Sequence, residues 1–343
     1  MSAAVPISSP GPSSVRRRVG WMAAAFAALL VAALLSLAVG SRPVAPSHVL
    51  DALLHGGTDP DSVTVRSFRV PRTLIGVMVG AALALAGTAL QGITRNPIAD
   101  PGVLGISQGA SLGVVVAMTA AGLHRLSDYV WFGFVGAAAA SVGVYAVATR
   151  GRGGASPVKL ALAGAAINAL LVSVISGVLT TRASALDEFR FWQVGSIAGR
   201  DAAIAGQLWP FLLVGTAAVL ASARGLDALA LGEDMAKGLG RNVGLVRITA
   251  GLGATVLTGA GVAAAGPIAF LGLAVPHIAR ALVGTGHRWV LPMAALLGPV
   301  ILLTADVLGR VIYTEGEVPS GVMTALLGLP FLVTLVRRKA VAA

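Results

Sequence analysis

The sequence contains no cysteine and little charge. The absence of cysteine from all 343 residues excludes a disulfide framework, a thiolate nucleophile and a cysteine metal site. Only 11% of the residues are Asp, Glu, Lys or Arg, whereas 56% are hydrophobic, and the mean hydropathy is +0.85. These values lie far outside the range of a soluble domain. The chain is therefore predicted to be a polytopic membrane protein.

Patterns that carry catalytic chemistry are also missing. None of the three lysines is followed by Ser or Thr, so the sequence holds no G-x-x-x-x-G-K-[ST] phosphate-binding loop. The five histidines stand singly, with no HExxH pattern and no paired-carboxylate spacing. The net charge of +11 is spread over loops and is not gathered into one basic patch. We expect no enzymatic activity, no cofactor, no metal site and no nucleic-acid partner.

Long uncharged runs dominate what is present. A helix needs about 20 apolar residues to cross the hydrocarbon core of a membrane. The run from 248 to 279 is too long for one crossing, and Gly266-Pro267 and Pro276 are expected to break it. Dividing this run predicts an all-α fold of about ten transmembrane helices. The nine runs without Asp, Glu, Lys or Arg are 19–41, 73–94, 101–124, 129–149, 160–181, 202–223, 248–279, 289–305 and 318–336.

An even number of crossings places both ends of the chain on one side. The basic clusters 16–18 and 337–339 mark that side as cytoplasmic, because cytoplasmic loops are enriched in Lys and Arg. With alternating loops, sixteen of the 25 basic residues fall on the cytoplasmic side and nine fall outside. Residues 1–18, which begin with a Pro/Ser-rich stretch, are predicted to form a disordered cytoplasmic tail. Residues 19–343 are predicted to form a single transmembrane domain.

Two stretches of small residues are similar to each other. GAALALAG (80–87) and GAGVAAAG (259–266) are identical at five of eight positions. The match predicts a five-plus-five repeat whose halves insert in opposite senses, which is a common transporter architecture. Chance similarity in a chain rich in Ala and Gly is the alternative.

Six short motifs follow one another along both halves of the chain: FRVPR (68–72), NPIADP (96–101), GISQGA (105–110), GPIAFLGLAVPHIAR (266–280), ADVLGR (305–310) and EVPSG (317–321). Together they resemble the permease family shared by ATP-driven importers of ferric siderophores, haem and cobalamin. The resemblance implies ten helices per subunit, a second permease subunit, two ATPase subunits and an extracytoplasmic substrate-binding protein. It also implies a bacterial inner (cytoplasmic) membrane and ATP hydrolysis on a separate chain.

Three arginines are expected on the outer side, against the general charge bias. Arg69 and Arg72 flank Pro71, and Arg310 follows the span 289–305. Guanidinium groups can form bidentate pairs with carboxylates, and the resemblance implies that arginines here grip acidic residues of the binding protein. Snorkelling to lipid phosphates is the alternative explanation. We expect Arg69, Arg72 and Arg310 to form the docking site.

The longest cytoplasmic loop, 224–247, is expected to hold a short helix over 231–239 that Gly240 ends. A solvated connector is the alternative. The resemblance implies that this segment docks into a groove on the ATPase subunit. The predicted coupling residues are Gly232, Glu233, Asp234, Met235, Lys237 and Gly240.

NPIADP is expected to form a tight turn at the cytoplasmic end of the span 73–94. Its key residues are Asn96, Pro97, Asp100 and Pro101, because a residue that precedes proline is disfavoured in a helix.

Polar residues inside the span 160–181 are candidates for the translocation path. Asn168, Ser173 and Ser176 lie there, and intramembrane polar groups often line a cavity, although serines also serve ordinary helix packing. The resemblance implies that this helix lines the path. The lone His277 is expected to be an interfacial hydrogen-bonding residue and not a metal ligand.

The sequence is therefore interpreted as a permease subunit of an ATP-driven importer, with a ferric siderophore as its expected cargo. Haem and cobalamin are alternative cargoes. An ion-coupled secondary transporter is a further alternative, but it needs ionisable residues within spans. The nearest such residue, Asp306, is expected toward an outer boundary.

Overall fold

The computed structural model describes residues 12–40, 43–102, 105–123, 126–150, 157–313 and 316–341, in which helices and turns occur without strands. The helical segments, in chain order, are α1 (Pro12–Ala38), α2 (Pro46–Leu54), α3 (Pro60–Val63), the π-helical η1 (Thr64–Arg69), α4 (Val70–Thr94), α5 (Ile106–Ala120), α6 (Leu126–Thr149), α7 (Pro157–Thr180), α8 (Ala183–Gln193), α9 (Ala202–Ala221), α10 (Ala223–Ala230), α11 (Glu233–Gly238), α12 (Val243–Ala265), α13 (Leu271–Val283), α14 (His287–Ile312) and α15 (Ser320–Val341).

The helices confirm the prediction of a polytopic membrane protein. Seven helical segments are long and apolar enough to cross a membrane, and three shorter apolar helices, which lie in α5, α13 and α15, accompany them. Each of the ten predicted spans overlaps one of these helices, and seven of the helices are of spanning length. The structure also adds helices that the spans did not predict, because α2, α3 and α8 lie outside the long apolar runs.

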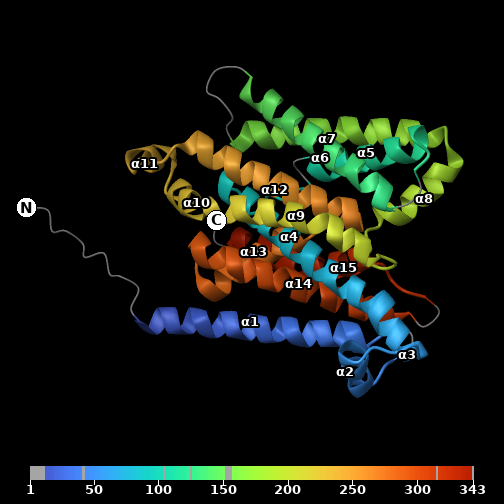
Figure 1. Ribbon diagram of the computed structural model, residues 1–343. Helices are drawn as coiled ribbons and strands as arrows, with labels where there is room; N and C mark the ends of the chain where they lie inside the picture. The colour runs from blue at the N-terminus through green and yellow to red at the C-terminus, as the bar shows by residue number, and fades with distance from the viewer. Residues whose placement is uncertain are drawn as a thin grey trace, which may run out of the picture.

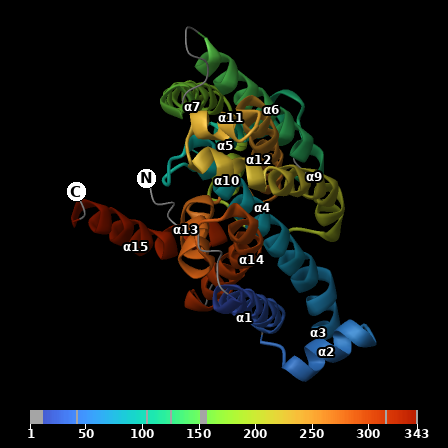
Figure 2. The ribbon, with the colours of Figure 1, turned by 90° about the vertical axis from the view of Figure 1, so that its left-hand side faces the viewer.

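The spanning helices run side by side, so that the molecule has two distinct ends (Figure 1). The start of α1 lies at the same end as α10 and α11, which is called the α11 end here. The opposite end carries α2, α3 and α8 and is called the α2 end. Figure 2 looks onto the α11 end and shows that α2 lies across the axis of the bundle, beside the far end of α1.

Helix α4 occupies the centre of the bundle, with 18 of its 25 residues buried. It packs closely because glycines lie at its crossings with other helices. A Cβ atom on Gly80 would lie 2.7 Å from the backbone of Pro299 in α14, and one on Gly87 would lie 2.1 Å from the carbonyl oxygen of Gly272 in α13. Small residues at such crossings let helix backbones approach within a membrane.

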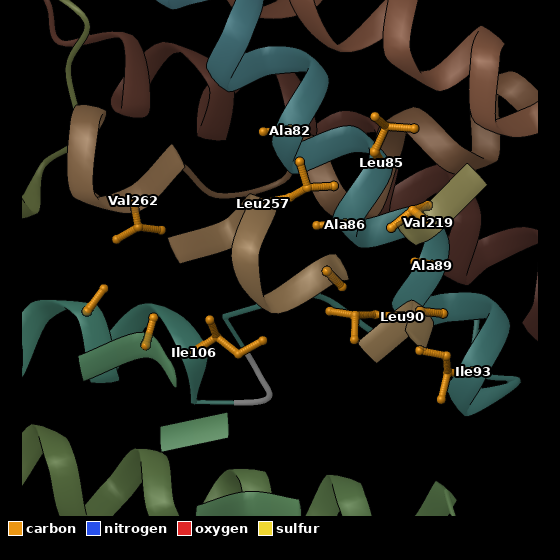
Figure 3. Close-up of a cluster of buried hydrophobic side chains, with 14 of the residues drawn as sticks. Ala82, Leu85, Ala86, Ala89, Leu90, Ile93, Ile106, Val219, Leu257 and Val262 are labelled. Atoms are coloured by element: carbon orange, nitrogen blue, oxygen red, sulfur yellow. The ribbon is translucent and has the colours of Figure 1, made fainter. Parts of the chain in front are cut away.

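The largest group of buried side chains surrounds α4 (Figure 3). Leu85 and Leu90 of α4 belong to one cluster with Ile106 of α5, Val219 of α9 and Leu257 of α12. Side chains from both halves of the chain therefore meet on this helix. Helix α4 is therefore the central helix against which the other helices pack.

The long run 248–279 is divided, as its Gly-Pro sequence predicts. Helix α12 ends at Ala265, and Gly266 has a φ of 74°, which favours glycine. Helix α13 begins after Phe270, which also lies in the left-handed region with a φ of 70°. Pro276 lies inside α13 and does not end it.

The first half of the chain contains a matching arrangement. Helix α4 runs toward the α11 end and is followed by a turn and the short α5, whereas α12 runs toward the α2 end and is followed by a break and the short α13 (Figure 1). These opposed directions are what the predicted inverted repeat requires. The repeat itself stays a prediction.

Helix α1 begins at Pro12, earlier than the span at 19 predicts. Proline fits the first position of a helix because its missing N–H has no partner to lose there. Residues 1–11 of the predicted tail lie outside the described residues. Most side chains of α1 are exposed, so this helix lies at the periphery of the bundle.

Candidate functional site

Two of the three predicted docking arginines, Arg72 and Arg310, share one carboxylate at the α2 end. Asp306 of α14 accepts hydrogen bonds from Arg72 of α4, with Nε 3.0 Å from Oδ2 and Nη2 2.8 Å from Oδ1. Arg310, one turn later in α14, donates to Oδ2 of the same carboxylate from Nε at 3.0 Å. The side chain of Asp306 is only 1% exposed. Two charge-assisted contacts therefore hold a buried anion between two cations.

Arg69 and Arg310 also hold the end of α1. Arg310 Nη1 donates to the carbonyl oxygens of Ser36 at 2.8 Å and Val39 at 3.0 Å. Arg69 Nη1 donates to those of Leu37 at 2.7 Å and Ala38 at 2.8 Å. The last carbonyl groups of a helix have no partner within the helix, and cations near that end are favourable. These arginines therefore satisfy the end of α1 and join it to the rest of the bundle.

Arg72 also pairs with an accessible carboxylate. Its Nη1 lies 2.7 Å from Oε2 of Glu317, whose side chain is 35% exposed. The side chain of Arg72 itself is 12% exposed, whereas Arg69 and Arg310 are buried. The structure thus brings the three arginines into one cluster, in which Arg72 lies beside the exposed Glu317.

The two carboxylates of this cluster were not assigned to the docking site from the sequence. The spacing of Asp306 and Arg310 is a usable signal, because residues four apart lie on one face of a helix. No such signal joins Arg72 to Asp306, which lies 234 residues away in the sequence. Only the packing of α4 against α14 brings these two side chains together.

At the opposite end, the predicted short helix is present as α11. It begins after Gly232, which has a φ of 109°, and Gly240 follows it with a φ of 73°. Met235 is 57% exposed, as is Leu239. Glu233 forms an ion pair with Arg247 of α12. Asp234 and Lys237, two of the other predicted coupling residues, are exposed, so that α11 presents both apolar and charged side chains.

The NPIADP turn is closed by its own side chains. Asn96 Oδ1 accepts a hydrogen bond from the backbone N–H of Ile98 at 3.1 Å, and Asp100 Oδ1 accepts one from that of Gly102 at 2.8 Å. Short polar side chains stabilise turns in this way. Burial raises the pKa of the Asp100 carboxyl group. Pro97 follows Asn96 and Pro101 follows Asp100, and these two X-Pro dipeptides lie between α4 and α5.

Helix α13 is joined to this region by polar contacts. His277 Nε2 donates a hydrogen bond to the carbonyl oxygen of Pro97 at 2.8 Å. Gln91 Nε2 donates to the carbonyl oxygens of Gly272 at 3.2 Å and Leu273 at 3.3 Å, and Arg280 donates to Gln91 Oε1. His277 was expected to form a hydrogen bond, and its partner is the carbonyl group of Pro97 in the turn.

The three predicted path residues lie on α7 in different surroundings. Asn168 is half-buried, and its Oδ1 has no hydrogen-bond partner within the part of the chain that the structure describes. Ser173 and Ser176 are exposed. Ser173 Oγ donates to the carbonyl oxygen of Ala169 at 2.9 Å, as hydroxyl groups commonly do inside helices. A single copy of the chain therefore leaves uncovered the face of α7 that carries Ser173 and Ser176.

Comparison with known proteins gives consistent results over nearly the whole chain. Residues 28–338 match the FecCD transport family. The ferric enterobactin transport system permease protein FepD of Escherichia coli (strain K12) is 42% identical over 312 residues, which cover 91% of this chain and 93% of FepD. The hemin transport system permease protein HmuU of Yersinia pestis is 40% identical over 286 residues, 80% of this chain and 83% of HmuU.

A solved structure shares the fold as well. It shows a metal-chelate type ABC transporter in an inward-facing conformation, and it superposes with a TM-score of 0.81 at 26% sequence identity. The superposition covers 92% of this chain and 98% of the solved chain. The helix arrangement described above is therefore that of a permease of known architecture.

Proposed function

The chain belongs to the FecCD transport family, and on that premise we propose that it forms the translocation path of an ATP-driven importer of ferric siderophores. The observation that carries this proposal is the 42% identity with a ferric enterobactin permease across 91% of the chain. The chain supplies the transmembrane helices and the hinges between these helices. Together with a second permease subunit it encloses the cavity. ATP hydrolysis takes place on separate subunits.

Haem is the second candidate cargo. The hemin permease is 40% identical but aligns over 80% of the chain, against 91% for the enterobactin permease. The wider match favours a ferric siderophore. The difference in identity is small, so that the two cargoes have to be separated by direct uptake measurements.

The α11 end is proposed to face the cytoplasm of a bacterial cell. The basic residues at the start of α1 and the loop that contains α11 lie at this end, and cytoplasmic loops are enriched in such residues. The exposed Met235 and Leu239 provide an apolar surface for an ATPase subunit. One ATPase subunit for each permease subunit gives two in the complete importer.

The α2 end is proposed to receive the substrate-binding protein. Arg72, which is 12% exposed, lies beside the exposed Glu317 there, while Arg69 and Arg310 hold the end of α1 in place. The path itself is proposed to lie between two permease subunits. The exposed Ser173 and Ser176 and the half-buried Asn168 of α7 support that location.

An ion-coupled secondary transporter is less well supported by the geometry. Asp306 is the nearest ionisable candidate for such coupling. It lies at the α2 end, where Arg72 and Arg310 both pair with it. A carboxylate paired with two arginines away from the middle of the bundle has no evident part in carrying an ion across the membrane.

Uptake by cells with and without the gene tests the proposal. Iron supplied as ferric enterobactin, haem and cobalamin are offered in parallel, and an ATPase-inactive strain serves as the control. Loss of iron uptake alone supports a siderophore cargo. Loss of haem or cobalamin uptake alone keeps the transporter class and changes the cargo. Gradient-driven uptake by the purified chain alone in liposomes would contradict the ATP-driven mechanism.

A further inference from the structure

The guanidinium group of Arg72 contacts two carboxylates through different nitrogen atoms. Asp306 binds Nε and Nη2, at 3.0 Å and 2.8 Å. Glu317 lies 2.7 Å from the remaining nitrogen, Nη1. Arg72 is thus held on one edge by a residue of α14 and on the other by a residue of the segment before α15.

The two carboxylates differ in how easily they can leave. Asp306 is 1% exposed and also pairs with Arg310, so that its departure would leave buried cations without an anion. Glu317 is 35% exposed, and water can solvate its carboxylate as soon as it moves away. An accessible ion pair of this kind contributes little net stability. Glu317 is therefore the exchangeable partner of Arg72.

We propose that Asp306 is a positioning residue that orients Arg72 toward the outside, and that Glu317 holds the place that a carboxylate of the binding protein takes on docking. This inference rests on the docking role proposed above. Its ligand is an Asp or Glu side chain of the partner. Docking then replaces one charge-assisted contact of Nη1 by another, so that Arg72 stays paired before and after.

The other two arginines hold the end of α1. Arg69 Nη1 donates to two carbonyl oxygens of α1, and Arg310 donates to α1 and to Asp306. Breaking these contacts would expose the end of a spanning helix. The contact of Arg72 with Glu317, by contrast, involves an exposed carboxylate and no helix end.

Glu317→Gln tests the inference directly. The variant removes the competing charge, so that the binding protein of the same importer should bind about fivefold more tightly. Binding is measured by interferometry with the permease in lipid nanodiscs. The gain should persist at high salt, because it comes from a direct contact and not from long-range attraction.

Asp187→Asn is the matched control. Asp187 lies in α8 at the same end and forms an exposed pair with Arg190 at 3.5 Å, so its neutralisation changes the net charge by the same amount. This variant should bind as the wild type does at high salt. An equal gain in both variants would mean that charge alone, and not the place beside Arg72, determines affinity.

A double-mutant cycle with Arg72→Gln completes the test. The gain from Glu317→Gln should disappear in the Arg72→Gln background. Asp306→Asn should weaken binding more when Arg72 is present than when it is absent, whereas general misfolding would weaken binding equally in both backgrounds. Unchanged or weaker binding by Glu317→Gln, with normal wild-type binding, would overturn the inference alone. Absence of binding by the wild type would instead contradict the proposed docking.

Discussion

At the scale of single residues, the arginine cluster gives different roles to side chains of one type. Arg69 and Arg310 cap α1, whereas Arg72 points its last nitrogen toward an exposed glutamate. The roles follow from the acceptors around each guanidinium group and not from the residue type. A sequence motif can therefore identify the arginine cluster, but it does not show which role each arginine has.

The buried carboxyl group in the turn after α4 makes stability depend on pH. Burial raises the pKa of Asp100. The unfolded chain releases this proton near pH 4, and the folded chain retains it to higher pH. Between these two values the folded state binds more protons, so that stability falls as the pH rises.

Asp100→Asn should remove this loss of stability. The Asn side chain keeps an oxygen for the backbone N–H of Gly102, which lies 2.8 Å from Asp100 Oδ1, and carries no charge. Thermal unfolding in detergent from pH 4 to pH 8 should show a flatter profile for the variant than for the wild type. Asp187→Asn, at an exposed position, should leave the wild-type profile unchanged. Parallel curves for Asp100→Asn and the wild type would contradict this prediction.

The sequence indicates part of the arginine cluster, whose docking role stays a prediction. Arg72 and Arg310 are identified by their motifs, and the spacing of Asp306 and Arg310 in ADVLGR is visible without a structure. The pairing of Arg72 with Asp306 and Glu317 is not, because it depends on how α4, α14 and the segment before α15 pack together. Contacts between residues this far apart in the sequence have no local signal.

At the scale of helices, the crossing of α4 and α14 depends on two glycines. A Cβ atom on Gly298 would lie 2.2 Å from the carbonyl oxygen of Gly80, and one on Gly80 would lie 2.7 Å from Pro299. These neighbours are backbone atoms, which cannot move aside as the end of a flexible side chain can. The two helices can therefore lie this close only because Gly80 and Gly298 have no side chains.

Gly80→Ala should lower the thermal unfolding midpoint of the purified protein. Forcing a methyl group into this crossing is expected to cost about 1–3 kcal/mol, because the helices have to separate. Gly206→Ala in α9 is the control, since no heavy atom lies within 4 Å of a Cβ atom there. That variant should keep or raise the midpoint, because Ala favours helix more than Gly does. Equal midpoints for the two variants would contradict the close crossing.

Helix α11 provides a functional prediction at the same scale. Met235→Asp places a charge on the proposed ATPase-binding surface and should abolish uptake and ATPase association. The midpoint of unfolding should stay near that of the wild type, because Met235 is 57% exposed. Met235→Leu keeps an apolar side chain and should retain uptake. Normal uptake by Met235→Asp would exclude this face of α11 from coupling.

The sequence predicts helices well where the membrane dictates them. Uncharged runs locate the spans because the hydrocarbon core demands about 20 apolar residues, and Gly266-Pro267 locates the break before α13. Helices α2 and α3 lie outside the spans, so that this constraint does not apply to them. The early start of α1 at Pro12 was missed for the same reason, since the helix continues through charged residues.

At the scale of the whole molecule, one chain leaves an important face uncovered. Ser173 and Ser176 are exposed on α7, which lies at the edge of the bundle in Figure 2. The predicted second subunit would cover such a face. The choice between a second copy of this chain and a related permease can be tested chemically.

Ser173→Cys should give a covalent dimer on mild oxidation if two copies meet through α7. The natural chain has no cysteine, so that a single introduced thiol can form a disulfide only between chains. Val31→Cys, on the exposed face of the peripheral α1, should remain monomeric on a non-reducing gel. Monomers for both variants would argue against pairing of two copies through this position.

The capping of α1 also has a consequence for how the protein is made. Arg69, which binds the carbonyl oxygen of Leu37, follows it by 32 residues, so that α1 and α4 can associate soon after both leave the ribosome. Arg310 follows Ser36 by 274 residues. The contact of Arg310 with α1 can therefore form only after 274 further residues have been synthesised, long after the contact of Arg69.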